Sequence, residues 1–592
     1  MRSFPPLITI LSPLLASGLI GLLGRTLNER TARISIWALA ISTGAAILTL
    51  YEVVQHDATA LKFSGLPAPF TPLILVDRLA AVMMVLITGV SVVIHVYSRR
   101  YMQGEPGYIK FFGLLSLLTF VLLSLVTSGN LFWLFICWHA VTWLLKILLS
   151  FHEERPPSHP PISPAHPARV ETRAFPCSEP AKTGSSPAAR RAGRTAMWVL
   201  GLGDAALLIA IILIYATFGT LDITELFQAV KDPSTVPILW EGTPWEMHSV
   251  AAITMVLVVT IMTKSAQFPF HVWLPGTIEA PTPVSAMLHA GIVNAGGFLV
   301  NRLAPLYGMA PTTLYLLFII GALTALIGAA AMLAQPSIKR TLVYSTMGQM
   351  GYMVMECGLG AFALAIFHLC AHGLFKATLF LNSGTGIHRA KTEFKLPSHH
   401  AIREPVGFSF MTWATGLVIT LLLPLVIVLM AHGVVNIPLF EAQGTVIFLF
   451  FAWVTSAQAI FSLYRLEAVA SWKVSATMVA TLSFIGLTYL WAGESFTHFL
   501  YPAPGQAAAY FQAAGWHQGL FDAFVALSAL LIVAVWVILY GKAHGMRLIL
   551  PAWFGTIYTR IYVAFLSGLY VEDVLQALAR APKRVRGIRL RP

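Results

Sequence analysis

One charged residue interrupts a long apolar stretch near the middle of this 592-residue chain. Lys264 follows the apolar run 249–263, and the residues after it read SAQFPFHVWLP. An ammonium group is costly to place inside a bilayer, so a lysine within a membrane span usually faces protein or water and serves a function. The feature therefore predicts a polar site embedded in a membrane protein.

The composition also places the chain in a bilayer. Hydrophobic residues make up 57% of it and charged residues only 11%, which leaves too little polar surface to cover a soluble domain. The net charge of +13 is concentrated in alternate loops, a pattern typical of membrane topology that gives no hint of nucleic-acid binding. The four cysteines have no CxxC spacing, so neither a disulfide framework nor a zinc site is indicated, and we expect no cofactor in this chain.

Apolar segments long enough to span a membrane recur along the chain. A span needs about 20 apolar residues, and roughly fifteen segments qualify: 6–24, 34–54, 74–97, 111–127, 131–151, 196–218, 249–269, 283–304, 312–334, 341–358, 361–383, 406–431, 444–464, 475–492 and 519–541. The sequence therefore predicts an all-α polytopic membrane protein.

The basic loops give the orientation of these spans. They follow the first, third, fifth, ninth and eleventh spans, at 25–33, 99–110, 155–194, 339–340 and 388–403. Because basic loops stay in the cytoplasm, the N-terminus is expected in the periplasm and the C-terminus in the cytoplasm of a bacterial inner membrane.

Two segments differ from the rest. Residues 152–195 are rich in Pro, Ser, Ala and Arg with few apolar side chains, which predicts a disordered or extended cytoplasmic loop. The tail after 541 mixes apolar positions with charges, a pattern that fits an interfacial or lateral amphipathic helix as well as a simple membrane anchor.

Lys264 has two interpretations. It could extend from a helix end towards the headgroups, but Pro269 and Pro275 follow closely and would break the helix. Broken helices at membrane depth are tolerated where they line a polar cavity. A lysine buried in such a place can accept and release a proton.

Further titratable residues lie within later spans. His289 should lie well inside its span, where it is either a proton carrier or an ordinary core residue. His368, His372 and Lys376 are spaced i, i+4, i+8, which places them on one helical stripe. The two histidines could chelate a metal, but Lys376 would repel a cation, so a histidine–lysine proton relay is the favoured interpretation.

Three residues in earlier spans could belong to the same polar path. Asp204 lies deep within its span and could pair with a lysine, or could merely be an acidic group near a helix N-terminus. His139 and Lys146 are seven residues apart in the fifth span, and therefore on one helical face.

Four stretches carry a family resemblance: TKSAQFPFHVWLP, APTPVSAMLHAGIVNAGGFLVNR, KRTLVYSTMGQMGYM and HLCAHGLFKATLFLNSG. Together they resemble the antiporter-like, proton-conducting subunits of respiratory complex I, subunit 5/L type, over roughly residues 70–390. The resemblance implies two inverted five-helix repeats with broken helices. It makes Lys264 the broken-helix lysine, His289 the histidine of the next helix, and His368, His372 and Lys376 the second half-channel.

The pattern departs from complex I in two places. The family's glutamate in the fifth span is replaced, since the chain reads Trp138-His139-Ala140, and the span 406–431 lacks the family's lysine. With its GLGDAALL and NAGGFLVNR runs, the chain more closely resembles DabB, the membrane-subunit family of energy-coupled inorganic carbon pumps.

This second resemblance implies a division of labour. The membrane subunit, which is not itself an enzyme, would conduct protons or another cation, and a soluble zinc-dependent, carbonic-anhydrase-like subunit of DabA type would hydrate carbon dioxide. The alternative is a proton-pumping subunit of an NADH-quinone oxidoreductase or membrane hydrogenase.

The resemblance also implies boundaries between regions of the chain. The expected regions are three N-terminal helices (1–110), a first repeat (111–269, containing the insert 152–195), a second repeat (270–431), and C-terminal helices with a basic tail (432–592).

Overall fold

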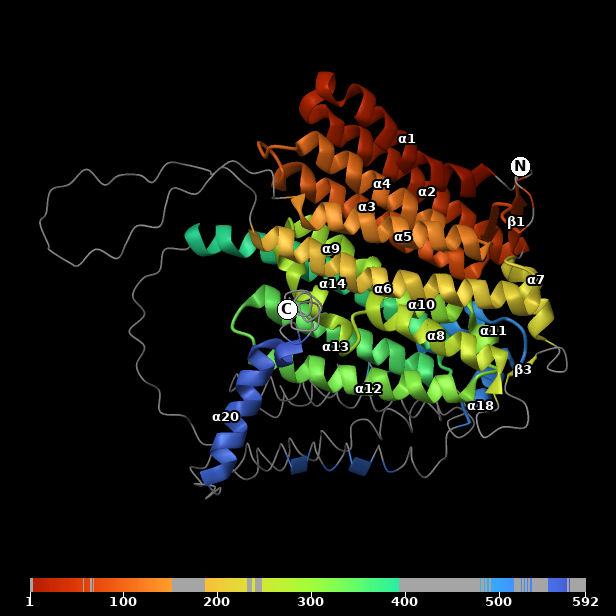
Figure 1. Cartoon of the computed structure of the whole chain (residues 1–592). Coiled ribbons are helices and arrows are strands. Elements are labelled where there is room, and N and C mark those ends of the chain that lie inside the picture. Colours follow the sequence, from red (N-terminus) through yellow and green to blue (C-terminus); the bar gives the residue numbers. More distant parts are fainter. Residues whose placement is uncertain are drawn as a thin grey trace, which may run out of the picture.

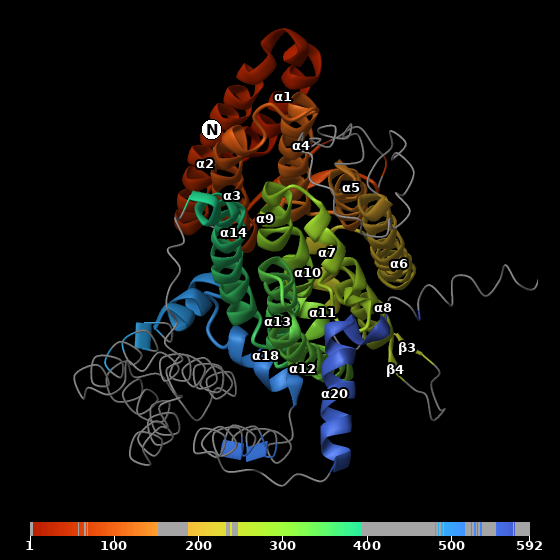
Figure 2. The same cartoon turned by 90° about the vertical axis from the view of Figure 1, so that its left-hand side faces the viewer.

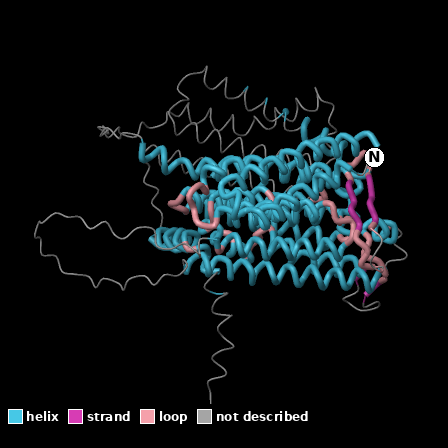
Figure 3. Tube along the Cα trace, turned by 90° about the horizontal axis from the view of Figure 1, so that it is seen from above, coloured by secondary structure: helices cyan, strands magenta, loops and turns pink. Residues whose placement is uncertain are grey.

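The computed structural model is a bundle of long, roughly parallel helices (Figures 1 and 3). It describes residues 4–151, 187–392, 491–515 and 552–571, apart from short gaps at 57, 64–66, 68, 232–236 and 240–246, and a few isolated positions between 480 and 574. The spans predicted at 406–431 and 444–464, and most of those at 475–492 and 519–541, lie outside the described residues.

The N-terminal part supplies five long helices: α1 (Phe4–Leu27), α2 (Thr31–His56), α3 (Arg78–Tyr101), α4 (Tyr108–Val126) and α5 (Leu131–Leu149). Polar caps mark where two of them begin. The Asp77 carboxylate accepts a hydrogen bond from the Ala80 amide at the start of α3, and Asn130 accepts one from the Phe132 amide at the start of α5. Such caps satisfy amide groups that have no partner within the helix.

The central part contains both continuous and broken helices. In chain order they are α6 (Pro187–Phe218), α7 (Ile223–Val230), α8 (Ser249–Lys264), η4 (Phe270–Trp273), η5 (Pro275–Glu279), α9 (Thr282–Ala290), η6 (Ile292–Asn294), α10 (Ala295–Arg302), α11 (Ala304–Tyr307), α12 (Pro311–Ala334), α13 (Ile338–Gly358) and α14 (Phe362–Thr392). α8 ends at Lys264, and the span after it is interrupted at Ile292–Asn294.

The predicted spans agree well with these helices. Each of the eleven spans predicted up to residue 383 matches a helix or a broken helix. Among the described residues, eight helical segments are long and apolar enough to cross a membrane, the first of them comprising both α1 and α2. The chain is thus a multi-pass, mostly helical membrane protein.

One boundary prediction was wrong. Residues 187–195 were expected to belong to the cytoplasmic loop 152–195, but they form the first turns of α6. The composition of this stretch misled the prediction, because alanine and arginine are also strong helix formers. Residues 152–186 lie outside the described part of the chain.

α12 and α13 pack closely along their length through small residues. A Cβ atom at Gly328 of α12 would lie 2.5 Å from the Gly348 amide nitrogen of α13, and one at Gly351 would overlap the backbone of α12 at Ala325. Glycine at these positions therefore lets the two backbones touch, as small residues do between membrane helices. This packing fixes the position of α13, which lies beside α14.

Short elements lie at the ends of the bundle. β1 (Thr59–Lys62) pairs antiparallel with β2 (Leu73–Val76), and β3 (Ile238–Leu239) with β4 (Met247–His248). At the opposite end, α20 (Ala552–Leu566) lies across the direction of the bundle helices, followed by η8 (Gly568–Tyr570) (Figures 1 and 2).

α20 is fastened to the bundle through its C-terminal end. The Gln335 side chain, just after α12, donates to the backbone oxygens of Phe565 and Leu566 at 3.3 and 3.5 Å. Residues 491–500 are also helical, and α18 (Gln506–Ala514), which follows them, packs against α12 and α14.

Candidate functional site: two buried charged clusters

Lys264 forms the centre of the first cluster. Its side chain is 1% exposed. The ammonium donates to the Trp138 backbone oxygen at 3.1 Å and to the Thr142 hydroxyl at 2.8 Å, and it lies 4.9 Å from the centre of the Trp138 ring. Since the side chain is buried against α5, Lys264 does not extend from its helix end towards the headgroups, and the first of the two interpretations is excluded.

The counter-charge of Lys264 comes from α6. One carboxylate oxygen of Asp204, which is 2% exposed, lies 3.6 Å from the ammonium nitrogen. Asp204 lies in the middle of α6, so the alternative of an acidic group near a helix N-terminus is wrong. Close packing brings the two helices together: Thr260 of α8 donates to the Gly203 backbone oxygen at 3.0 Å, and a Cβ atom at Gly203 would overlap Thr263.

His139 extends this cluster to the surface of the bundle. Its Nδ1 lies 2.8 Å from the second carboxylate oxygen of Asp204, and its Nε2 accepts a hydrogen bond from the Trp143 indole at 2.9 Å. The His139 side chain is 40% exposed. His139 thus gives the buried Asp204–Lys264 pair a titratable contact with the outside of α5 and α6.

Lys146 does not join this cluster. Its ammonium lies 4.8 Å from the centre of the ring of Trp143. Trp143 is one helical turn after His139 on α5. The expectation that Lys146 shares a face with His139 is confirmed, but the structure does not bring it to Lys264.

The chain break after Lys264 is held by side chains. Ser265 donates from its hydroxyl to the Val293 backbone oxygen at 2.7 Å and accepts from the Gly296 amide at 3.1 Å, while the Trp273 indole donates to the Thr263 backbone oxygen at 2.9 Å. These bonds satisfy backbone groups freed by the interruption. They also connect the chain break after α8 with the break between α9 and α10.

His289 lies on the other side of this junction. The ring is fully buried in α9 and stacks on Phe380 of α14, with centroids 4.2 Å apart. The described residues leave both nitrogens of this buried ring without a protein hydrogen-bond partner.

The second cluster lies between α13 and α14. The Lys376 ammonium, 1% exposed, donates to the Ser345 hydroxyl at 2.7 Å. His372, 5% exposed, has no hydrogen-bond partner at either ring nitrogen among the described residues. The predicted stripe on α14 therefore faces the bundle interior over these two residues.

His368 completes the stripe and is the most firmly held of the three. Its Nδ1 lies 3.1 Å from both carboxylate oxygens of Glu356, and its Nε2 lies 2.9 Å from the Gln349 side-chain oxygen. Glu356 is 3% exposed. The second cluster thus resembles the first: each contains one lysine and one carboxylate, with one histidine in the first and two in the second.

Glu356 was missed by the sequence reasoning, which did not name it among the titratable residues of the later spans. It lies on α13, one element earlier. The signal was present, because Glu356 is a lone carboxylate in the span predicted at 341–358 and such a residue is costly in a membrane. Within the described part of the chain, no three His, Cys, Asp or Glu side chains are grouped as a metal site.

Comparisons with known proteins agree with the motifs. Residues 181–435 match the family described as NADH:quinone oxidoreductase/Mrp antiporter, TM, and residues 66–112 match the family described as NADH-Ubiquinone oxidoreductase (complex I), chain 5 N-terminus.

Two curated relatives differ in how much of each chain aligns. A "Probable inorganic carbon transporter subunit DabB1" from Halothiobacillus neapolitanus is 37% identical over 96% of this chain and 95% of that protein. A subunit L of NADH-quinone oxidoreductase from Neisseria meningitidis serogroup B is 35% identical over 64% of this chain, which spans about half (53%) of that protein.

Solved structures share the fold. One, of an Mrp complex from Dietzia sp. DQ12-45-1b, aligns with a TM-score of 0.55 at 23% identity and covers 99% of this chain and 63% of that one. Another, of an archaeal membrane-bound sulfane sulfur reductase, aligns with a TM-score of 0.54 at 16% identity and covers 91% of this chain and 97% of that one.

Proposed function

Because the chain belongs to the antiporter-like membrane subunits of the complex I and Mrp family, and within it to the group of DabB1, we propose that it conducts protons in an energy-coupled inorganic carbon pump. The extent of the alignment supports this choice over a redox complex, because similarity to DabB1 covers nearly the whole of both proteins while similarity to subunit L covers about half of that protein.

One observation carries the proposal. Two clusters of buried titratable groups lie on either side of His289: the first at the end of α8, where the helix is broken, and the second between the continuous helices α13 and α14. Buried charges of this kind are expensive and mark ion pathways.

We assign the roles along this path from the contacts. His139 exchanges protons between the surface of α5 and α6 and Asp204, and Lys264 takes them up beside that carboxylate. His289 connects the two halves, since α9 packs on α14. Lys376, His372 and His368, with Glu356 as the counter-charge of His368, form the second half.

The free energy for carbon accumulation would come from the ion gradient. Each charge moved through 100 mV of membrane potential is worth about 2.3 kcal/mol, enough to bias the hydration of carbon dioxide in one direction. We propose that the hydration site belongs to a soluble, zinc-dependent, carbonic-anhydrase-like partner. The chain itself would lie in a bacterial inner membrane with its N-terminus in the periplasm and its C-terminus in the cytoplasm.

A membrane subunit of a redox-driven complex is the competing function. The adjacent reading frames distinguish the two: a large soluble protein with cysteine, histidine and aspartate zinc-type ligands supports the carbon pump, and a series of quinone oxidoreductase subunits supports the competitor.

Co-expression tests the proposal directly. The chain alone, the adjacent soluble reading frame alone and the pair are expressed in cells that lack their own carbon uptake, and accumulation of labelled inorganic carbon is measured with and without an uncoupler. The proposal predicts accumulation by the pair only, and its loss with the uncoupler. Accumulation by this chain alone, or accumulation that persists with the uncoupler, would contradict it.

A further inference from the structure

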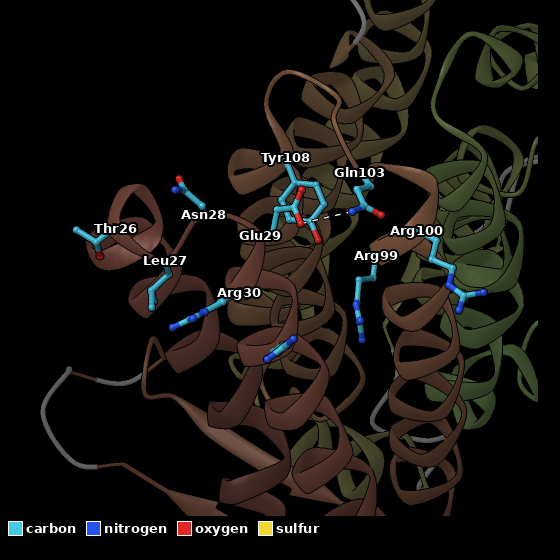
Figure 4. Close-up of a pocket in the computed structure, with 10 residues that line it drawn as sticks. Thr26, Leu27, Asn28, Glu29, Arg30, Arg99, Arg100, Gln103 and Tyr108 are labelled. Atoms are coloured by element: carbon cyan, nitrogen blue, oxygen red, sulfur yellow. Dashed lines mark hydrogen bonds between the residues drawn. The ribbon is translucent and has the colours of Figure 1, made fainter.

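A cavity of about 660 Å³ opens at the end of the bundle where the α1–α2 link meets the end of α3 and the start of α4 (Figure 4). Four of its lining residues are arginines from two separate parts of the chain: Arg30 and Arg33 near the start of α2, and Arg99 and Arg100 in the last turn of α3. Neither the proton path nor the proposed carbon pump uses this site.

The cavity has a strong excess of positive charge. Glu29 is its only lining carboxylate, and the Gln103 side chain donates to it at 3.5 Å (Figure 4). Among the described residues, none of the four guanidinium groups has an ion pair with a carboxylate. Arginine side chains gathered in this way match phosphate groups, which they bind through paired hydrogen bonds.

The position of the arginines along the helices sets the depth of the site. Arg33 lies in the first turn of α2 (Thr31–His56), and Arg100 lies in the last turn of α3 (Arg78–Tyr101). Both helices belong to segments that are long and apolar enough to cross a membrane. The guanidinium groups therefore lie where a span ends, which is the depth of the lipid headgroups.

An apolar stripe continues from Arg33 into the membrane. Trp37, Ile41 and Leu48 follow it on the same face of α2, and their side chains are 70%, 57% and 58% exposed.

A second stripe continues from Arg100. Val96 and Val93 precede it on one face of α3 and are 52% and 56% exposed. α2 and α3 pack side by side, and each carries an exposed apolar stripe with an arginine at its headgroup end. A soluble anion would need the arginines but not these surfaces.

We propose that this cavity binds an anionic phospholipid carrying two phosphodiester groups, with Arg30, Arg33, Arg99 and Arg100 around the phosphates and the acyl chains along the two stripes. Four cations against one carboxylate leave more positive charge than a single phosphodiester would neutralise. The cavity volume lies within the usual range for sites that hold a molecule of headgroup size.

Native mass spectrometry of the purified full chain tests the site. The protein is titrated in detergent with tetraoleoyl cardiolipin, dioleoyl phosphatidylglycerol or dioleoyl phosphatidylcholine, and bound lipid is counted. Wild type should retain cardiolipin most strongly. Arg33→Gln combined with Arg100→Gln should weaken cardiolipin retention about tenfold or more, because two charge-assisted contacts are lost.

A charge-matched control separates the site from general attraction. Arg194→Gln combined with Arg340→Gln removes two exposed arginines of other basic segments that do not line the cavity, and it should bind cardiolipin like wild type. Equal loss in both double variants would overturn the proposal, because binding would then follow net charge alone. Circular dichroism and gel-filtration volume confirm that each variant is folded.

Two further results would assign the arginines to another ligand. If millimolar inorganic pyrophosphate displaces cardiolipin, the site binds a soluble polyphosphate and not a lipid. If the Arg33 and Arg100 variant binds cardiolipin normally but loses its soluble partner in co-purification, the arginines form a protein interface. Either result contradicts a lipid site. Arg33→Lys with Arg100→Lys keeps the charge but not the paired geometry and should bind with intermediate strength.

Discussion

Removing the Asp204 carboxylate should damage both stability and conduction, by amounts that the geometry predicts. In Asp204→Asn the ammonium of Lys264 stays buried, with its hydrogen bonds to Trp138 and Thr142 but without a counter-ion. At the 3.6 Å separation of the pair, unit charges attract by about 4–5 kcal/mol at an effective dielectric constant of about 20. Breaking a buried pair by removing one partner typically costs about 3–5 kcal/mol.

A double-mutant cycle separates this stability effect from conduction. Lys264→Met removes the ammonium and leaves Asp204 with its bond to His139. In the combined variant neither charge is left unpaired, so its loss in free energy of unfolding should be smaller than the sum of the single losses by about 2–3 kcal/mol. Inorganic carbon uptake should be abolished in all three variants, because the proton site is lost in each.

Two measurements complete the cycle. Unfolding by dodecyl sulfate in mixed micelles gives the free energies, and labelled carbon uptake in cells that co-express the adjacent soluble reading frame gives the activity. Additive losses of stability would refute the ion pair. A double variant that is stable and also supports normal uptake would refute the role of the pair in conduction.

Two other substitutions test the second cluster and the glycine packing between α12 and α13 that positions it. Glu356→Gln keeps the shape of the side chain but removes the carboxylate beside His368, so uptake should fall about tenfold or more, whereas Glu494→Gln, in an exposed pair with His498, should leave uptake unchanged. Gly351→Ala should lower the free energy of unfolding by about 1–3 kcal/mol, because the methyl group meets the α12 backbone; Gly18→Ala, with nothing within 4 Å of the new Cβ atom, is its control.

The sequence located the spans and the buried cations because membrane burial penalises charge so strongly. Lys264, His289 and the stripe ending at Lys376 could be found for this reason alone, and the helix ends after Lys264 as Pro269 and Pro275 suggested. Asp204 was a candidate partner of a lysine, and the structure places it at 3.6 Å from Lys264.

The residues that were missed depend on packing between helices. Glu356 and His368 meet only because α13 lies beside α14, a position set by the glycine contacts between α12 and α13. No periodicity within one helix reveals such a pairing. The role of Trp143 as a contact of both His139 and Lys146 likewise follows from side-chain orientation that the sequence pattern does not give.

The most direct test of the account is Lys264→Arg. The substitution keeps a positive charge beside Asp204, and therefore the ion pair, but arginine does not release its proton at accessible pH. Uptake of labelled inorganic carbon by the variant, co-expressed with the adjacent soluble reading frame, is compared with wild type at equal membrane protein levels. The account predicts a folded, inserted protein without uptake; uptake at the wild-type rate would show that Lys264 does not carry the proton.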